Sequence, residues 1–113
     1  MPYISTKTNV AISKDKEIAL KTAFGKAIEN VPGKTENWLM LEFSDSQRMW
    51  FAGDDAPVAM LEVKIFGSAS DSAYDALTGA LTDIVSTELL IAQSRIYIKY
   101  EEIDNWGWNG NNF

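Results

Sequence analysis

The sequence contains no cysteine and no histidine. The missing cysteines exclude disulfides, thiol nucleophiles and Cys-x-x-Cys redox chemistry, and the two absences together remove the ligands of most zinc sites. The missing histidines also remove the side chain that most often serves as a general base near pH 7. Acid–base chemistry must therefore use a carboxylate, a lysine, a tyrosine or a terminal amine. We expect no metal and no other cofactor.

Basic stripes, long apolar runs and a secretory signal are also absent. The net charge is −6 without blocks of like charge, whereas nucleic-acid-binding surfaces are basic and anionic lipids attract basic patches. Residues 1–20 lack a basic segment followed by an apolar one, and no apolar run reaches membrane-spanning length. We therefore expect no nucleic-acid partner, no membrane partner and a cytosolic location.

What remains is an ordinary globular composition in 113 residues, with 46% hydrophobic and 23% charged residues. This length fits one domain, and the composition argues against disorder. We expect residues 1–113 to form a single α/β domain.

Hydrophobic patterns predict four strands, two helices and a hairpin. The strands are expected at residues 3–8, 38–43, 58–66 and 95–101. One helix begins after Ser13, a good N-cap, and ends at Pro32-Gly33, while the second begins near Asp71. In the tail, Asn109-Gly110 is a turn signal for a short closing hairpin.

In order, these elements form two β-α-β units, each a right-handed crossover between parallel strands. They predict a four-stranded mixed sheet with two helices on one face. The strands at 38–43 and 58–66 are apolar at nearly every position, which is typical of strands covered on both faces. Because two helices cover only one face, we expect a homo-oligomer to cover the other.

This topology brings chemical groups together at one edge of the sheet. Both strands of a parallel unit begin at the same edge, so Pro2 lies near Lys34, with Trp38 entering the sheet beside them. If the second unit packs antiparallel to the first, Ile65 and Phe66 reach this edge too. Removal of Met1 exposes the amine of Pro2 there, so a terminal amine, a lysine and aromatic side chains converge.

Short motifs along the whole chain resemble those of the macrophage migration inhibitory factor family of tautomerases. They are Pro2 after the initiator methionine, Thr8-Asn9, Gly33-Lys34, Phe51-Ala52-Gly53, Asp55-Ala56-Pro57, Gly67, Arg95–Ile98 and Trp106–Phe113. The resemblance implies the duplicated β-α-β fold, a homotrimer with its active site between subunits, and keto–enol interconversion of arylpyruvates such as phenylpyruvate.

The resemblance also implies roles for individual residues. Pro2 is then the catalytic base, and Lys34 binds the substrate carboxylate. Tyr97 comes from a neighbouring subunit, and Lys99 replaces a family asparagine and adds a positive charge at the pocket. The implied pocket walls are Tyr3, Trp38, Ile65, Phe66, Trp106 and Phe113. The family's Cys-x-x-Cys motif is absent, so thiol oxidoreductase activity is not implied.

The implied mechanism depends on a neutral amine. A free α-amine has a pKa of about 8. Burial among aromatic side chains and the positive charge of Lys34 both lower that pKa. A neutral Pro2 amine can take a proton from one substrate atom and return it to another. Lys34 and Lys99 then stabilise the negative charge of an enolate-like transition state.

Other readings of the same residues remain open. Lys34 suits a helix C-terminus as a solvated lysine, and Trp38, Phe66 and Tyr97 suit a core or an interface. The rival function is a cytokine-like interaction protein, exported without a signal peptide, that binds a protein receptor and keeps a vestigial tautomerase site. Decarboxylases and dehalogenases of the superfamily rely on further arginines near the site, which Arg48 and Arg95 do not match.

Overall fold

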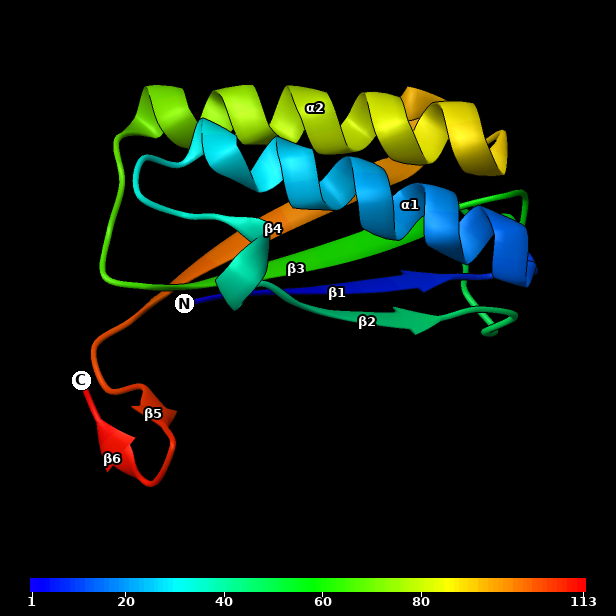
Figure 1. Ribbon diagram of the computed structural model, residues 1–113. Helices are drawn as coiled ribbons and strands as arrows, with labels where there is room; N and C mark the ends of the chain where they lie inside the picture. The colour runs from blue at the N-terminus through cyan, green and yellow to red at the C-terminus, as the bar shows by residue number, and fades with distance from the viewer.

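The computed structural model describes residues 1–113 and shows one sheet with both helices on the same face (Figure 1). The strands are β1 (Pro2–Thr8), β2 (Met40–Ser44), β3 (Ala59–Phe66) and β4 (Ile96–Ile103), and the helices are α1 (Lys14–Ala27) and α2 (Asp71–Leu89). Three short 3₁₀ turns are η1 (Ile28–Asn30), η2 (Glu36–Trp38) and η3 (Gln93–Arg95), and a hairpin of β5 (Gly107–Trp108) and β6 (Asn111–Asn112) follows. Neither helix combines the length and apolar character that crossing a membrane requires.

The sheet is mixed, as predicted. Its strand order is β2-β1-β3-β4, and each β-α-β unit contributes one parallel pair. Antiparallel pairing of β1 with β3 joins the two units and places Pro2 opposite Ile65. The duplicated fold predicted from the sequence is therefore confirmed, and the start of β1 meets the end of β3.

Caps and apolar stripes explain the two helices. The Ser13 hydroxyl accepts a hydrogen bond from the backbone N–H of Lys16 at 3.2 Å, and Ser70 caps α2 in the same way. Buried side chains such as Phe24 and Leu81 form a core of 16 residues between the helices and one face of the sheet. Burial of each large apolar side chain stabilises the fold by roughly 1.5–3 kcal/mol.

The open face of the sheet differs from the apolar face that we expected. Val63 and Ile65 face the helices and are fully buried, whereas Glu62 and Lys64 of the same strand lie on the open face. Glu62 also pairs with Lys99 of β4 at 3.7 Å. The expectation that β3 is apolar on both faces was wrong, because its two charged residues, Glu62 and Lys64, both lie on the open face. The pattern of β3 therefore gives no support for a homo-oligomer.

The beginning of β2 and the tail are also informative. β2 begins at Met40 rather than at Trp38, because the preceding residues form the η2 turn. The predicted tail hairpin is confirmed, with φ of 52° at Asn109 and 86° at Gly110. Such left-handed pairs favour Asn-Gly. The hairpin projects from the same end of the sheet as the N-terminus (Figure 1).

Candidate active site

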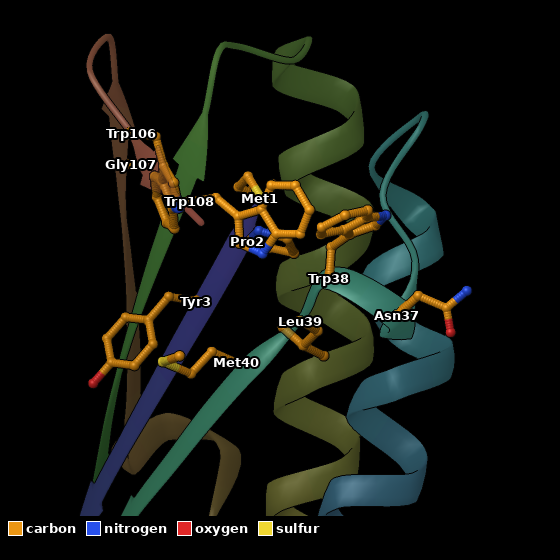
Figure 2. A pocket seen from close by; sticks show the side chains of 10 residues that line it. All are labelled: Met1, Pro2, Tyr3, Asn37, Trp38, Leu39, Met40, Trp106, Gly107 and Trp108. Carbon is orange, nitrogen blue, oxygen red and sulfur yellow. The ribbon is translucent and has the colours of Figure 1, made fainter. Parts of the chain in front are cut away.

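A cavity of about 790 Å³ lies where β1 and β2 begin (Figure 2). The start of β1, the segment from η2 into β2, and the C-terminal hairpin form its walls. The lining residues are Met1, Pro2, Tyr3, Asn37, Trp38, Leu39, Met40, Trp106, Gly107 and Trp108. Seven of them are hydrophobic, and a concave apolar wall with few polar groups is typical of small-molecule sites.

The terminal amine and the ammonium group of Lys34 lie together beside this cavity. The Nζ atom of Lys34 donates a hydrogen bond to the carbonyl oxygen of Phe66 at 3.0 Å, which holds the ammonium at the end of β3. Burial first, and the charge and hydrogen bond of Lys34 second, lower the pKa of the Met1 amine from 8.0 to about 6. This amine is therefore mostly neutral at pH 7. No three carboxylates lie in a group that could hold a metal ion.

Phe66 connects the lysine to the beginning of the chain. Its carbonyl accepts the bond from Lys34, while its N–H donates to the carbonyl oxygen of Met1 at 3.0 Å. Its ring packs on that of Phe113, with 5.5 Å between the ring centroids. Ile65, opposite Pro2, is fully buried and belongs to the core beneath the site. The end of β3 thus supports the site through its backbone.

Aromatic rings attach the C-terminal hairpin to this end of the molecule. Trp38 and Trp108 meet edge to face at 5.0 Å, and Trp108 stacks on Phe113 at 6.2 Å. Trp38 is 46% exposed and Trp108 is 51% exposed, so both rings remain open to a ligand. Planar ligands stack favourably against such rings.

Most of the predicted site residues come together. Pro2, Tyr3, Trp38 and Trp106 line the cavity itself. The others at this end are Lys34, Ile65, Phe66 and Phe113, which contact the start of β1, the end of β3 or the aromatic rings.

Two predicted residues lie elsewhere within the single chain. Tyr97 pairs in register with Met60 at the other end of β3, is 59% exposed, and packs on Phe51 at 5.0 Å. Lys99 lies on the open face of the sheet, where Glu62 and Glu101 pair with it. Neither reaches the cavity of its own chain. Their place in the site stays a prediction that requires a neighbouring subunit.

Sequence reasoning missed several lining residues. Met40 lines the cavity because it pairs in register with Tyr3, and Asn37 does so because the η2 turn replaces the first residues of the expected strand. Leu39 and Gly107 also line it. The parallel pairing of β1 with β2 could have predicted that Met40 lines the cavity, whereas no sequence pattern indicated the η2 turn.

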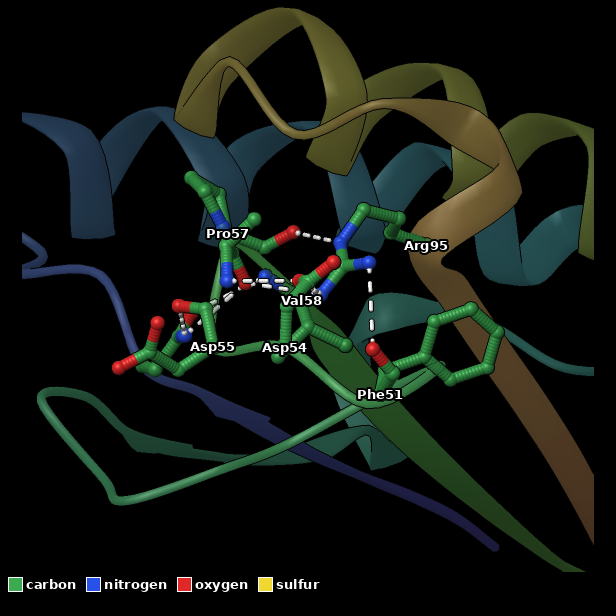
Figure 3. A network of polar contacts seen from close by, with 8 residues as sticks. Phe51, Asp54, Asp55, Pro57, Val58 and Arg95 are labelled. Atoms are coloured by element: carbon green, nitrogen blue, oxygen red, sulfur yellow. Dashed lines mark hydrogen bonds and ion pairs between the residues drawn. The ribbon is translucent and has the colours of Figure 1, made fainter.

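At the opposite end of the sheet, polar contacts fix the loop before β3 (Figure 3). Arg95 forms an ion pair with Asp54 at 2.8 Å and donates to the carbonyl of Pro57 at 2.9 Å. The Asn9 side chain donates to the carbonyl of Asp55 at 2.9 Å. Asn9, Asp55-Ala56-Pro57 and Arg95 of the family-like motifs therefore serve structure at this end.

Comparison with known proteins identifies the family. The sequence model of macrophage migration inhibitory factor (MIF) matches residues 1–113. The chain is 26% identical to the macrophage migration inhibitory factor homolog of Brugia malayi, and the match covers 100% of this chain and 99% of the relative. It is 27% identical to macrophage migration inhibitory factor of Xenopus laevis, with the same coverage.

Solved structures agree with the sequence match. The crystal structure of Leishmania major MIF2 superposes with a TM-score of 0.94 at 32% identity and covers 100% of this chain and 97% of that one. The homologue from Prochlorococcus marinus gives 0.89 at 28% identity and covers 98% of both chains. The sheet, its helices and the hairpin define a tautomerase-like α/β protein. The chain belongs to the macrophage migration inhibitory factor family. This relationship supports an isomerase-type enzyme.

Proposed function

We propose that this protein is a keto–enol tautomerase of arylpyruvates such as phenylpyruvate, with the Pro2 amine as acid and base. The observation that carries the proposal is a terminal amine with a lowered pKa beside Lys34 in an apolar cavity. Once Met1 is removed, the amine moves one residue inward to Pro2, which is buried. The same two causes then act on it, burial and the charge of Lys34.

The geometry supports a simple proton-transfer mechanism. The neutral Pro2 nitrogen takes a proton from C3 of the keto acid, and the electron pair of that C–H bond moves to make an enolate. The protonated nitrogen then returns its proton to the enolate oxygen, which gives the enol and restores the amine. A base whose pKa lies near the working pH performs both transfers well.

Two hydrogen-bond donors are available for the substrate carboxylate. Lys34 Nζ is already held at the end of β3. The N–H of Phe66 donates to the Met1 carbonyl, so removal of Met1 frees it. Both donors meet at Phe66, and an ammonium with a backbone N–H suits a carboxylate, because hydrogen bonds to charged groups are the stronger ones. The aromatic part of the substrate would lie against Trp38 and Trp108.

We infer that the active form is a homotrimer. Large apolar side chains are exposed at the cavity end, among them Met40 and Trp108, and also at the opposite end, where Trp50 and Tyr97 lie. In a closed ring of identical subunits each interface is head-to-tail, so these different ends can meet. Tyr97 would then reach the cavity of the next subunit, as the resemblance to the family implies.

The proposal is tested by one insertion. An alanine between Met1 and Pro2 turns the Pro2 nitrogen into a tertiary amide, which cannot accept a proton. We expect phenylpyruvate turnover to be lost, while light scattering and circular dichroism stay as in wild type. Intact mass must show that wild type begins at Pro2. A folded insertion variant that turns over phenylpyruvate at the wild-type rate would exclude Pro2 as the base, whereas a wild-type chain without turnover would favour the receptor-binding function.

A further inference from the structure

Met1 lies in the cavity that the proposed function assigns to the substrate. It lines this cavity together with Trp38, Trp106 and Trp108 and is partly buried. Figure 2 shows Met1 and Pro2 at the start of β1, in the middle of the ring of lining side chains. The first residue therefore forms part of the cavity wall and narrows the apolar space beside the aromatic side chains.

The backbone of Met1 occupies the polar part of the same site. Its carbonyl oxygen accepts the N–H of Phe66 at 3.0 Å, so this donor is not free. Its amine lies close enough to Lys34 to be affected by that charge. A carbonyl beside an apolar side chain is the same combination of groups that an aromatic 2-oxo acid presents.

We propose that Met1, while it is retained, is a built-in competing ligand of this cavity, and that its removal opens the binding site as well as creating the Pro2 amine. This inference rests on the proposed function, since it concerns the same cavity. Methionine suits the role because its unbranched thioether adapts to irregular space and contacts aromatic rings favourably. A tethered group also competes at an effective concentration on the order of millimolar.

Affinity, rather than turnover, separates this role from simple blockage of the amine. Any residue before Pro2 makes its nitrogen an amide and stops proton transfer. Only a residue that occupies the cavity also weakens ligand binding. A glycine before Pro2 supplies the matched comparison, because it keeps the amide and a carbonyl for Phe66 but has no side chain.

The first experiment compares three chains by phenylpyruvate titration, read by quenching of tryptophan fluorescence. The Pro2 chain is the processed protein, which begins at Pro2. The Met1 chain retains Met1, because it is expressed while methionine aminopeptidase is inhibited. The glycine chain carries a glycine inserted after Met1, so that processing leaves a glycine before Pro2. We expect the Met1 chain to bind about tenfold more weakly than the glycine chain, and the Pro2 chain to bind best. Equal affinity of the Met1 and glycine chains would overturn the proposal.

A second readout needs no substrate. The chain contains four methionines, so methyl-¹³C methionine labelling of a Met1-retaining chain gives four methyl signals. The signal of Met1 is identified as the one that is absent from the processed protein. Ring currents of the tryptophans should shift it upfield from the position of a solvent-exposed methionine. An unshifted signal would overturn the proposal. If the Met1 signal is shifted but the processed protein does not turn over phenylpyruvate, the role of Met1 is supported. Only the proposed reaction is then contradicted.

Discussion

Lys34 affects the terminal amine through its charge and through a hydrogen bond. A lowered pKa means that the ammonium form is disfavoured, so the fraction of neutral amine increases with pH. Because only the neutral form has a lone pair for the substrate proton, kcat/KM of the processed enzyme should rise with pH. Its midpoint should lie well below the value of about 8 of a free α-amine.

Lys34→Gln tests the origin of this midpoint. The substitution removes the charge but leaves the burial, which is the larger cause, so the midpoint should move up and still stay below about 8. Lys14→Gln is the matched control, since it removes the same charge from the far end of α1 (Figure 1). pH–rate profiles measure the shift. A profile that is flat between about pH 5 and 8, or a Lys34→Gln midpoint below that of wild type, would contradict this mechanism.

Thr6 offers a prediction about stability. Its side chain is fully buried and its Oγ1 atom has no hydrogen-bond partner. Thr6→Val keeps the shape and removes the unpaired hydroxyl, so we expect the free energy of unfolding to rise by about 1 kcal/mol. Thr8→Val is the contrasting control, because the equally buried Thr8 hydroxyl donates to the carbonyl of Val58 at 2.7 Å. Urea denaturation should show opposite shifts, and shifts of the same sign would refute the explanation.

At the scale of elements, the C-terminal hairpin depends on its turn. Gly110 has a φ of 86° with open space around it, so Gly110→Ala introduces backbone strain without a clash. The cost is on the order of 1–2 kcal/mol and falls on the hairpin alone. Because Trp106 and Trp108 of this segment line the cavity, KM for phenylpyruvate should rise while the melting temperature stays nearly unchanged.

The matched variant is Gly79→Ala in α2, another glycine with open space around it but with ordinary helical backbone. There we expect greater stability, by about 0.5–1 kcal/mol, and an unchanged KM. Calorimetry and steady-state kinetics check both variants. If Gly110→Ala leaves KM unchanged, the hairpin does not form the substrate wall.

Local patterns predicted the elements more accurately than their exposed surfaces. Ser13 and the Asn109-Gly110 pair act through nearest neighbours, so this cap and this turn appear directly in the sequence. The open face of β3 was misjudged because Glu62 and Lys64 are interspersed among apolar residues. Only the pairing of β3 within the sheet shows that Glu62 and Lys64 point away from the helices.

The sequence predicted those parts of the candidate site that follow from the order and direction of the strands. Strand order and direction brought Pro2, Lys34 and Phe66 to one edge, and the structure places them there. The η2 turn, which brings Asn37 to the cavity, has no clear pattern in the sequence. The proposed role of Tyr97 requires contacts between chains, which neither the pattern of one chain nor its fold determines.

At the scale of the whole molecule, light scattering should give about three times the chain mass of 12.6 kDa. In a monomer Tyr97 could not reach the cavity, because the two lie at opposite ends of the sheet. Tyr97 pairs with Met60 near the start of β3, whereas Pro2 pairs with Ile65 near its end. In a trimer, Tyr97→Ala should therefore impair catalysis in the neighbouring subunit's site rather than in its own.

Mixed trimers test this arrangement. The chain with alanine inserted before Pro2 has no base but an intact Tyr97, and Tyr97→Ala has the base but no tyrosine. Each homotrimer should be impaired. When the two are unfolded together and refolded as mixtures, some interfaces combine the Pro2 amine of one chain with the Tyr97 of the other, so activity should exceed the sum of the separate samples. Refolded mixtures without such a gain would show that Tyr97 does not complete a neighbouring site, whereas recovery would require a site shared between two subunits.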